Sequence, residues 1–294
     1  MKRLSRDKTV PCNLRYKVFD PVMIIEPGET IIVETINHMT PVVQSEKDLH
    51  QFGTPEYRER EETGPVYVKG VKQGDALAIH IEKIEMVGLP HAHGWSESML
   101  LKTRKAVSFP IKNNRCRLPG KLSIPVEPMI GDIYTTPSGE PKYYDHGGNM
   151  DFTEIKPGNT LYLPVFCEGG LLVLGDVHAA QGDGELLGEG AECAADVTLT
   201  IDVDHKYSSL RPLIETPNHW ITIACRNSIM ESKQLAIADM TRLLQKLYNI
   251  NEEDARTLCL LSGSFRVGGS LAYESWLKEP IVAISISKDI IKEN

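Results

Sequence analysis

The sequence predicts a mostly β protein of antiparallel, sandwich-like or barrel-like sheets, with a small helical pair near its C-terminal end. Apolar and polar side chains alternate over several short stretches, which is typical of strands with one buried face. A helical spacing of apolar residues is clear only late in the chain. The 294 residues, 41% hydrophobic and 24% charged, suffice for a large buried core. We therefore expect a single domain over residues 1–294.

Four alternating stretches define the expected strands: 31–33, 76–84, 197–203 and 282–286. In the second of them, Leu77, Ile79 and Ile81 share one face, whereas Ala78 and His80 lie on the other. Such alternation favours half-buried strands in antiparallel sheets.

The helical pair is expected at about 233–262. Ala236, Met240 and Leu244 recur at helical spacing, and Asn251 is placed to cap a second helix. The segment 105–150 is rich in Pro, Gly and basic residues, and we expect it to be mainly loop, serving as a lid or as an arm between subunits.

The net charge and the arrangement of the cysteines argue against several classes of protein. Asp plus Glu number 40 against 32 Lys plus Arg, and the net charge of -8 argues against nucleic-acid binding. The six cysteines form no CxxC pair, which disfavours a disulfide framework or a thiolate zinc site. The basic N-terminus leads into no apolar run, and no stretch approaches the roughly 18 apolar residues of a membrane helix. A cytoplasmic location without membrane partners is expected.

The most informative stretch is 174–185, which follows the apolar run 171–174. If that strand continues, Asp176 and His178 share one face, as two ligands of a metal site would. The glycines that follow allow the chain to turn sharply. Side chains that could then face the same cavity are Gln181, Asp183 and Glu185. The alternative is an acidic surface turn after a core strand.

A second patch, 146–151, also combines an imidazole with a carboxylate, in His146 and Asp151. Together the two patches offer mixed nitrogen and oxygen ligands for one divalent ion. Such ligands favour zinc, with calcium or manganese as alternatives.

The string 175–185, Gly-Asp-Val-His-Ala-Ala-Gln-Gly-Asp-Gly-Glu, resembles the signature of the acetamidase/formamidase family. Glu192 falls where that family places a glutamate, and the segments 63–68, 146–151 and 262–267 resemble other family segments, so the resemblance extends over about 20–290. It implies a metal-dependent hydrolase that converts small aliphatic amides to carboxylate and ammonia, and a homo-oligomer. The chain departs from the family at Asn37-His38, where an acidic residue is expected.

These residues suggest metal-assisted hydrolysis, in which a divalent ion polarises the amide carbonyl and activates a water molecule. The expected metal ligands are Asp176, His178, His146 and Asp151. Glu192, or second Glu185, would carry the proton to the leaving nitrogen, which departs poorly unless protonated. Gln181 or Asn149 would donate a hydrogen bond to the developing oxyanion, and Asn149 and Asp183 are expected to bind substrate.

Several alternatives stay open. His38 and His50 could reach the site from an early loop. The protein could be a non-catalytic metal-containing binding module, or a hydrolase of another C–N bond, in a cyclic amide or a urea derivative. A cysteine nucleophile, Cys167 or Cys193 near His178, is a further option that the resemblance disfavours.

Overall fold

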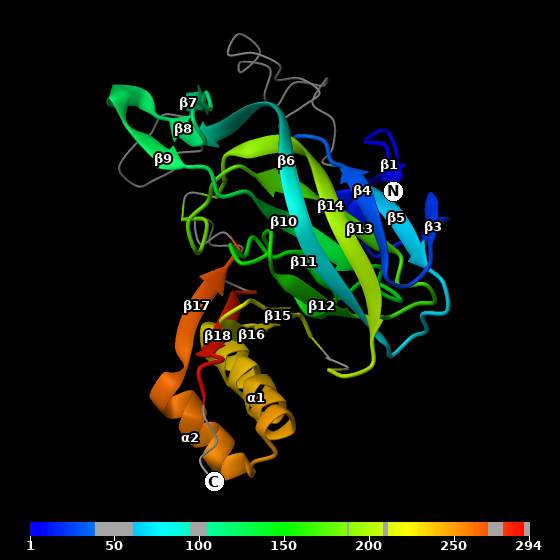
Figure 1. Ribbon diagram of the computed structural model, residues 1–294, viewed down its shortest axis with the longest axis vertical. Coiled ribbons are helices and arrows are strands. Elements are labelled where there is room, and N and C mark those ends of the chain that lie inside the picture. Colours follow the sequence, from blue (N-terminus) through cyan, green and yellow to red (C-terminus); the bar gives the residue numbers. More distant parts are fainter. Residues whose placement is uncertain (39–60, 95–104, 187, 208–210, 270–278, 291–294) are drawn as a thin grey trace.

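A computed structural model describes residues 1–38, 61–94, 105–186, 188–207, 211–269 and 279–290. Within these ranges the protein is mostly β, as predicted. Sixteen strands join in one continuous, branched sheet, and two further strands form a separate hairpin. Two helices lie together at one end of the molecule (Figure 1).

The strands of the N-terminal half are β1 (Lys2–Leu4), β2 (Thr9–Pro11), β3 (Met23–Ile25), β4 (Glu29–Glu34), β5 (Glu61–Val68), β6 (Ala76–Gly94), β7 (Lys105–Ser108), β8 (Arg115–Arg117), β9 (Ser123–Pro125), β10 (Met129–Thr135) and β11 (Gly147–Asn149). The remaining elements are β12 (Thr160–Pro164), β13 (Leu172–His178), β14 (Glu192–Asp204), β15 (Leu213–Glu215), β16 (His219–Cys225), α1 (Ile229–Tyr248), α2 (Glu252–Ser262), β17 (Ser264–Gly268) and β18 (Ile281–Ser287). Short 3-10 turns lie at η1 (Cys12–Leu14), η3 (Pro119–Lys121) and η4 (Tyr144–His146).

The sheet is built around two long strands, β6 and β14. They pair antiparallel from Asp204 opposite Ala76 to Glu192 opposite His91, and β4 pairs with the other edge of β14. The four predicted alternating stretches lie in β4, β6, β14 and β18. Leu77, Ile79 and Ile81 of β6 are fully buried in the main core, whereas the inward residues of β18 are buried in a second core beside the helices.

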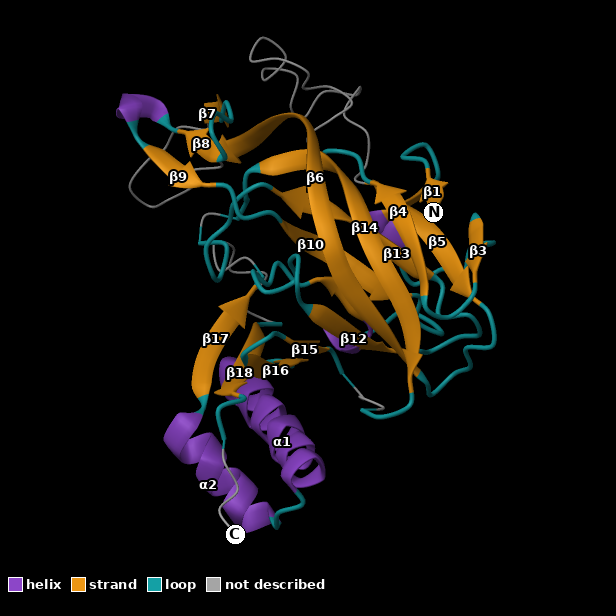
Figure 2. Cartoon of the chain, in the orientation of Figure 1, coloured by secondary structure: helices purple, strands orange, loops and turns teal. Residues whose placement is uncertain are grey.

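The helical pair packs on the C-terminal strands. Helix α1 begins at Ile229, four residues before the predicted start, because the Ser228 side chain accepts a hydrogen bond from the Glu231 N–H and caps it. Its buried face, which includes Ala236, Met240 and Leu244, packs on β16 and β18. Figure 2 shows both helices apart from the long strands. The predicted cap at Asn251 is confirmed, since its side chain accepts from the Asp254 N–H.

The prediction for 105–150 was wrong in one important respect. This segment contains five strands, of which β10 is buried along its whole length. A strand covered on both faces shows no polar-apolar alternation, and Gly131 and Asp132 interrupt its apolar run. The hairpin β8–β9 does project from the body of the molecule (Figure 1).

Candidate functional site

The end of β13 and the start of β14 bring a histidine and two carboxylates together. His178 and Glu192 are directly opposite in the antiparallel pairing of these strands. The Nε2 atom of His178 lies 2.9 Å from Glu192 Oε1 and 3.2 Å from Asp176 Oδ1. All three side chains are buried. The chain reverses direction between β13 and β14, and this reversal brings Glu192 next to Asp176 and His178.

The orientation of His178 is fixed by Gln181. The side-chain amide of Gln181 donates from Nε2 to the backbone carbonyl of Asp151, over 2.8 Å. Its Oε1 atom therefore faces His178 Nδ1 and accepts a hydrogen bond from it. This contact directs Nε2 toward Asp176 and Glu192, and a metal-binding imidazole is commonly oriented by such a partner on its other ring nitrogen.

A second group of potential ligands shares His178. The ligand atoms of Asp151, His178 and Glu185 lie within 4.8 Å of one another, as do those of Asp176, His178 and Glu192. Asn149 Nδ2 donates to Asp151 Oδ2 over 2.9 Å, and Asp151 Oδ1 is buried without a hydrogen-bond partner among the described residues. We call Asp151, Asp176, His178, Glu185 and Glu192 the signature site.

Two glycines that show no local pattern in the sequence make room for the signature site. A Cβ atom on Gly131 would lie 2.6 Å from Asp151 Oδ1 and 3.0 Å from Asp176 Oδ2. A Cβ atom on Gly190 would lie 2.5 Å from His178 Nδ1. Any side chain at these positions would displace the site residues.

The backbone at the signature site is itself unusual. Asp151, Asp176 and Glu185 adopt positive φ angles of 42°, 54° and 41°. Residues other than glycine rarely adopt this left-handed conformation, and when they do they often lie at functional sites.

Burial and mutual repulsion set the charges of the site. Burial, together with Glu185 and Asp176, raises the pKa of Asp151 well above its usual range. Burial also raises the pKa of Glu192, against the attraction of His178. Burial alone would raise the pKa of Asp176, but His38 and His178 outweigh it and the pKa lies well below the usual range. The site thus holds more carboxylates than cationic partners among the described residues, which favours a bound cation.

Asn37 and His38 both reach the signature site. His38 Nδ1 lies 2.8 Å from Asp176 Oδ1, and Asn37 Nδ2 donates to the backbone carbonyl of Glu192 over 3.2 Å. Asn37 therefore binds backbone at the point where an acidic side chain was expected. His50 lies outside the described residues.

Two predicted site residues lie apart from this constellation. The two metal-binding groups of the signature site do not include His146, whose buried ring packs edge-on against Tyr134 at 5.9 Å. Asp183 forms an ion pair with Arg266 at 2.8 Å, and its side chain is 38% exposed.

A cavity of about 470 Å³ adjoins the signature site. It reaches the site through Gln181 and Gly190, which both contact the Nδ1 edge of His178. The rest of its wall is mainly apolar, with Phe109, Cys116, Leu118, Ile124, Pro125, Ala180 and Ala191, together with Gly182, Glu127 and Glu189. A small uncharged molecule with an apolar part fits such a lining.

Neither α1 nor α2, the helices of the described part of the chain, has the length and apolar character needed to cross a membrane.

Comparison with known proteins identifies relatives of this chain. A family model described as the acetamidase/formamidase family matches residues 129–228, which contain all five residues of the signature site. The formamidase of Methylophilus methylotrophus is 47% identical over 47 residues. That match is local, because it covers 16% of this chain and 12% of the formamidase.

Two crystal structures match over nearly the full length. The acetamidase of Bacillus halodurans is 30% identical, with a TM-score of 0.86 and 97% of each chain covered. A protein of Thermoanaerobacter tengcongensis described as a predicted acetamidase/formamidase is also 30% identical, with a TM-score of 0.87, and the match covers 97% of this chain and 95% of that one. The chain therefore belongs to the acetamidase/formamidase family.

Proposed function

We propose that this protein is a metal-dependent amidohydrolase that cleaves the C–N bond of short linear amides and releases a carboxylate and ammonia. The observation that carries the proposal is the convergence of His178 Nε2 with the buried carboxylates of Asp176 and Glu192, beside a largely apolar cavity. Family membership supports the same reaction. The formamidase and acetamidase names belong to the relatives, and the activity of this chain is the proposal.

The residues present fit a divalent ion. His178 directs Nε2 at two carboxylates, and Asp151 Oδ1 and Glu192 Oε2 lack hydrogen bonds to the described residues. We propose Asp176, His178 and Asp151 as the ligands, because a Cβ atom on Gly131 would lie 2.6 Å from Asp151 Oδ1 and 3.0 Å from Asp176 Oδ2, so both carboxylates border the same space. Mixed nitrogen and oxygen ligands favour zinc. His146 is left out of this set, since it packs on Tyr134.

When bound, a divalent ion supplies polarisation of the amide carbonyl and lowers the pKa of water. Glu192 takes a proton from the attacking water and passes it to the departing nitrogen, so that ammonia leaves as a neutral molecule. Its raised pKa suits a group that must both accept and release a proton near neutral pH. Glu185 is the second candidate for this role.

Gln181 and Asn149 hold other groups in position for the reaction. Both polar ends of the Gln181 amide are engaged, by Asp151 and His178, so we assign it to positioning rather than to oxyanion binding. Asn149 uses one N–H on Asp151 and has a second for the carbonyl oxygen of the substrate. Asp183, paired with Arg266, would support the turn that carries Gln181.

The test is ammonia release by metal-loaded protein from formamide, acetamide and propionamide, compared with a lactam and urea. We expect turnover of the linear amides and little of the other two. Metal-loaded, folded protein that releases no ammonia from any linear amide would contradict the proposal. Turnover of the lactam or of urea alone would assign the site to another C–N bond. A homo-oligomer and a cytoplasmic location remain predictions.

A further inference from the structure

A second buried polar cluster lies on the other side of β10 and β13. It is formed by Cys12 in η1, Glu62 on β5 and Asp132 on β10, with Arg15 between the carboxylates. Arg15 Nη2 lies 3.0 Å from Asp132 and 3.7 Å from Glu62, and both carboxylates are fully buried. We call these four residues the cysteine cluster.

Two adjacent strands separate the cysteine cluster from the signature site. On β10, Gly131 faces Asp151 and Asp176, whereas Asp132 faces Arg15. On β13, Asp176 belongs to the signature site, whereas a Cβ atom on Gly175 would lie 2.9 Å from Glu62 Cγ. Successive strand residues point to opposite faces, so each strand contributes to both clusters.

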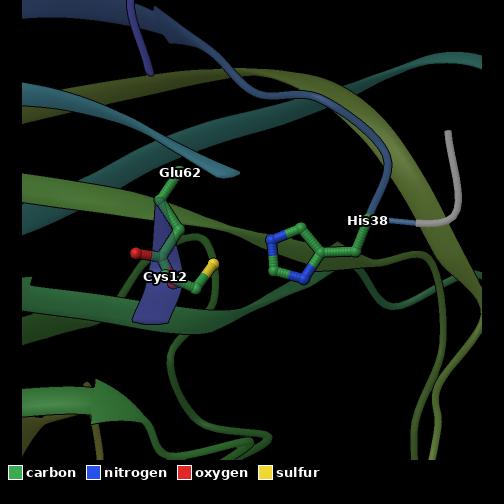
Figure 3. A group of neighbouring side chains, drawn as sticks. All are labelled: Cys12, His38 and Glu62. Atoms are coloured by element: carbon green, nitrogen blue, oxygen red, sulfur yellow. The ribbon is translucent and has the colours of Figure 1, made fainter. Parts of the chain in front are cut away.

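His38 connects the two clusters. Its Nδ1 atom lies 2.8 Å from Asp176 Oδ1, and its other ring nitrogen, Nε2, faces Cys12 and Glu62 (Figure 3). A carboxylate on Nδ1 holds the proton there and leaves the Nε2 lone pair free. Histidines that bind metal ions are commonly oriented in this way, by a carboxylate on the nitrogen away from the metal.

Cys12, His38 and Glu62, which meet at this point, are all residue types that bind metal ions. The Cys12 sulfur, a His38 nitrogen and a Glu62 oxygen lie within 4.8 Å of one another. His38 Nε2 and both oxygens of Glu62 are buried without a hydrogen-bond partner among the described residues. Buried polar atoms normally have a hydrogen-bond partner, so their grouping around one point requires an explanation.

The charges of the cluster also favour a bound metal ion. When both buried carboxylates, Asp132 and Glu62, are ionised, Arg15 compensates only one of their two negative charges. A divalent ion that binds together with the deprotonated thiol of Cys12 brings the net charge of the cluster to zero. Buried charges need such compensation.

We propose that Cys12, His38 and Glu62 form a second divalent metal site, distinct from the signature site and suited to zinc. Sulfur, nitrogen and oxygen ligands in one group are typical of zinc, and three protein ligands leave a fourth position open. Binding replaces the thiol proton of Cys12, which is released to solvent, by a metal–sulfur bond, with no change of oxidation state. Asp176 orients His38 for this site and belongs to the signature site as well.

The test uses cobalt(II), because a cobalt–thiolate bond gives a charge-transfer absorption band that nitrogen and oxygen ligands do not give. Full-length protein is freed of metal with a chelator and titrated with cobalt(II) alone. We expect a charge-transfer band whose final intensity corresponds to one thiolate-bound cobalt ion per chain and which is lost in Cys12→Ser. Wild-type protein without the band would overturn the proposal, whatever the variants do.

Matched variants assign the ligands. Cys193 is a second buried thiol near His178, outside the group of three, so Cys193→Ser should keep the band. Glu62→Gln should weaken cobalt binding more than about tenfold. Glu61→Gln, the neighbour on β5, should leave it unchanged. A band that persists in folded Cys12→Ser, or disappears in Cys193→Ser, would overturn the assignment.

The inference does not rest on the proposed function. The band reports the thiol of Cys12, whereas ammonia release reports the signature site. A band without amide turnover would count against the hydrolase only, and amide turnover without a band would count against this site only.

Discussion

Glu192 lies directly across from His178 in the β13–β14 pairing, with Oε1 2.9 Å from the imidazole Nε2. This contact joins the proposed proton carrier to a proposed metal ligand. Its consequence is that the two roles can be separated by substitution.

The first prediction concerns Glu192. Glu192→Gln keeps the size of the side chain but cannot carry a proton as a carboxylate does. We expect a folded protein that retains its metal and loses about 10²–10⁴ in kcat, with a smaller effect on KM. Steady-state ammonia release measures this, with the exposed Glu82→Gln as the control. Wild-type turnover would remove the proposed role, and loss of metal would make Glu192 a ligand.

The second prediction concerns metal binding at His178. His178→Ala removes the nitrogen common to both ligand groups of the signature site. We expect loss of one divalent ion per chain, together with amide turnover, by elemental analysis of purified protein. His80→Ala, a half-buried histidine on β6, serves as control and should keep both. A metal-free protein with full activity would contradict metal dependence.

The third prediction concerns the two glycines near Gln181. Gly190→Ala places a Cβ 2.5 Å from the His178 ring, whereas a Cβ on Gly182 meets no atom within 4 Å. We expect Gly190→Ala to lower the free energy of unfolding by about 1–3 kcal/mol, and Gly182→Ala to leave it nearly unchanged. Denaturant unfolding compares the two. Equal stability of both variants would show that His178 can move away without cost.

The fourth prediction concerns pH and His146. Burial, with repulsion from Arg15, lowers the pKa of His146 from 6.5 to about 4. The folded protein keeps this ring neutral where the unfolded chain protonates it, so its contribution to stability is complete above pH 6.5 and is lost as the pH falls toward 4. Since one pKa unit corresponds to about 1.4 kcal/mol, the full effect is roughly 3 kcal/mol.

His146→Phe should therefore flatten the dependence of unfolding free energy on pH between about 6.5 and 4, relative to wild type. Phe can keep the edge contact with Tyr134, and metal content should not change. An unchanged slope would contradict the lowered pKa. Loss of metal would return His146 to the ligand set.

The fifth prediction concerns assembly. The projecting β8–β9 hairpin exposes Ile124, and the adjoining Leu122 is 65% exposed. We expect a dimer or larger species by light scattering at micromolar concentration, and a shift toward monomer in Leu122→Lys. A monomeric wild-type protein would contradict this prediction.

The sequence predicted those parts of the fold whose pattern is local. Strands with one buried face, as in β4 and β14, show alternation, and the capped helices show their spacing and cap residues. Strand β10 was not predicted, because both of its faces are buried. Its membership in the sheet is decided by its neighbours rather than by its own residue pattern.

The same distinction applies to the site. Asp176, His178 and Glu185 stand within ten residues of one another, so the sequence alone could group them. Gly131 and His38 join them only through the pairing of distant strands, and the cysteine cluster draws on segments that no spacing rule connects. Asp183 was predicted from its position in the signature, but Arg266, 83 residues away, holds it in an ion pair outside the two ligand groups.

The alternation of Gly131 with Asp132, and of Gly175 with Asp176, limits how this protein can evolve. Deleting or inserting one residue ahead of either pair would turn each side chain to the opposite face. Asp132 would enter the space now kept open beside Asp151, and Arg15 would lose its partner at 3.0 Å. Relatives that keep both clusters should therefore keep the length of β10 and β13 unchanged and vary in length only in the segments that connect these strands to others.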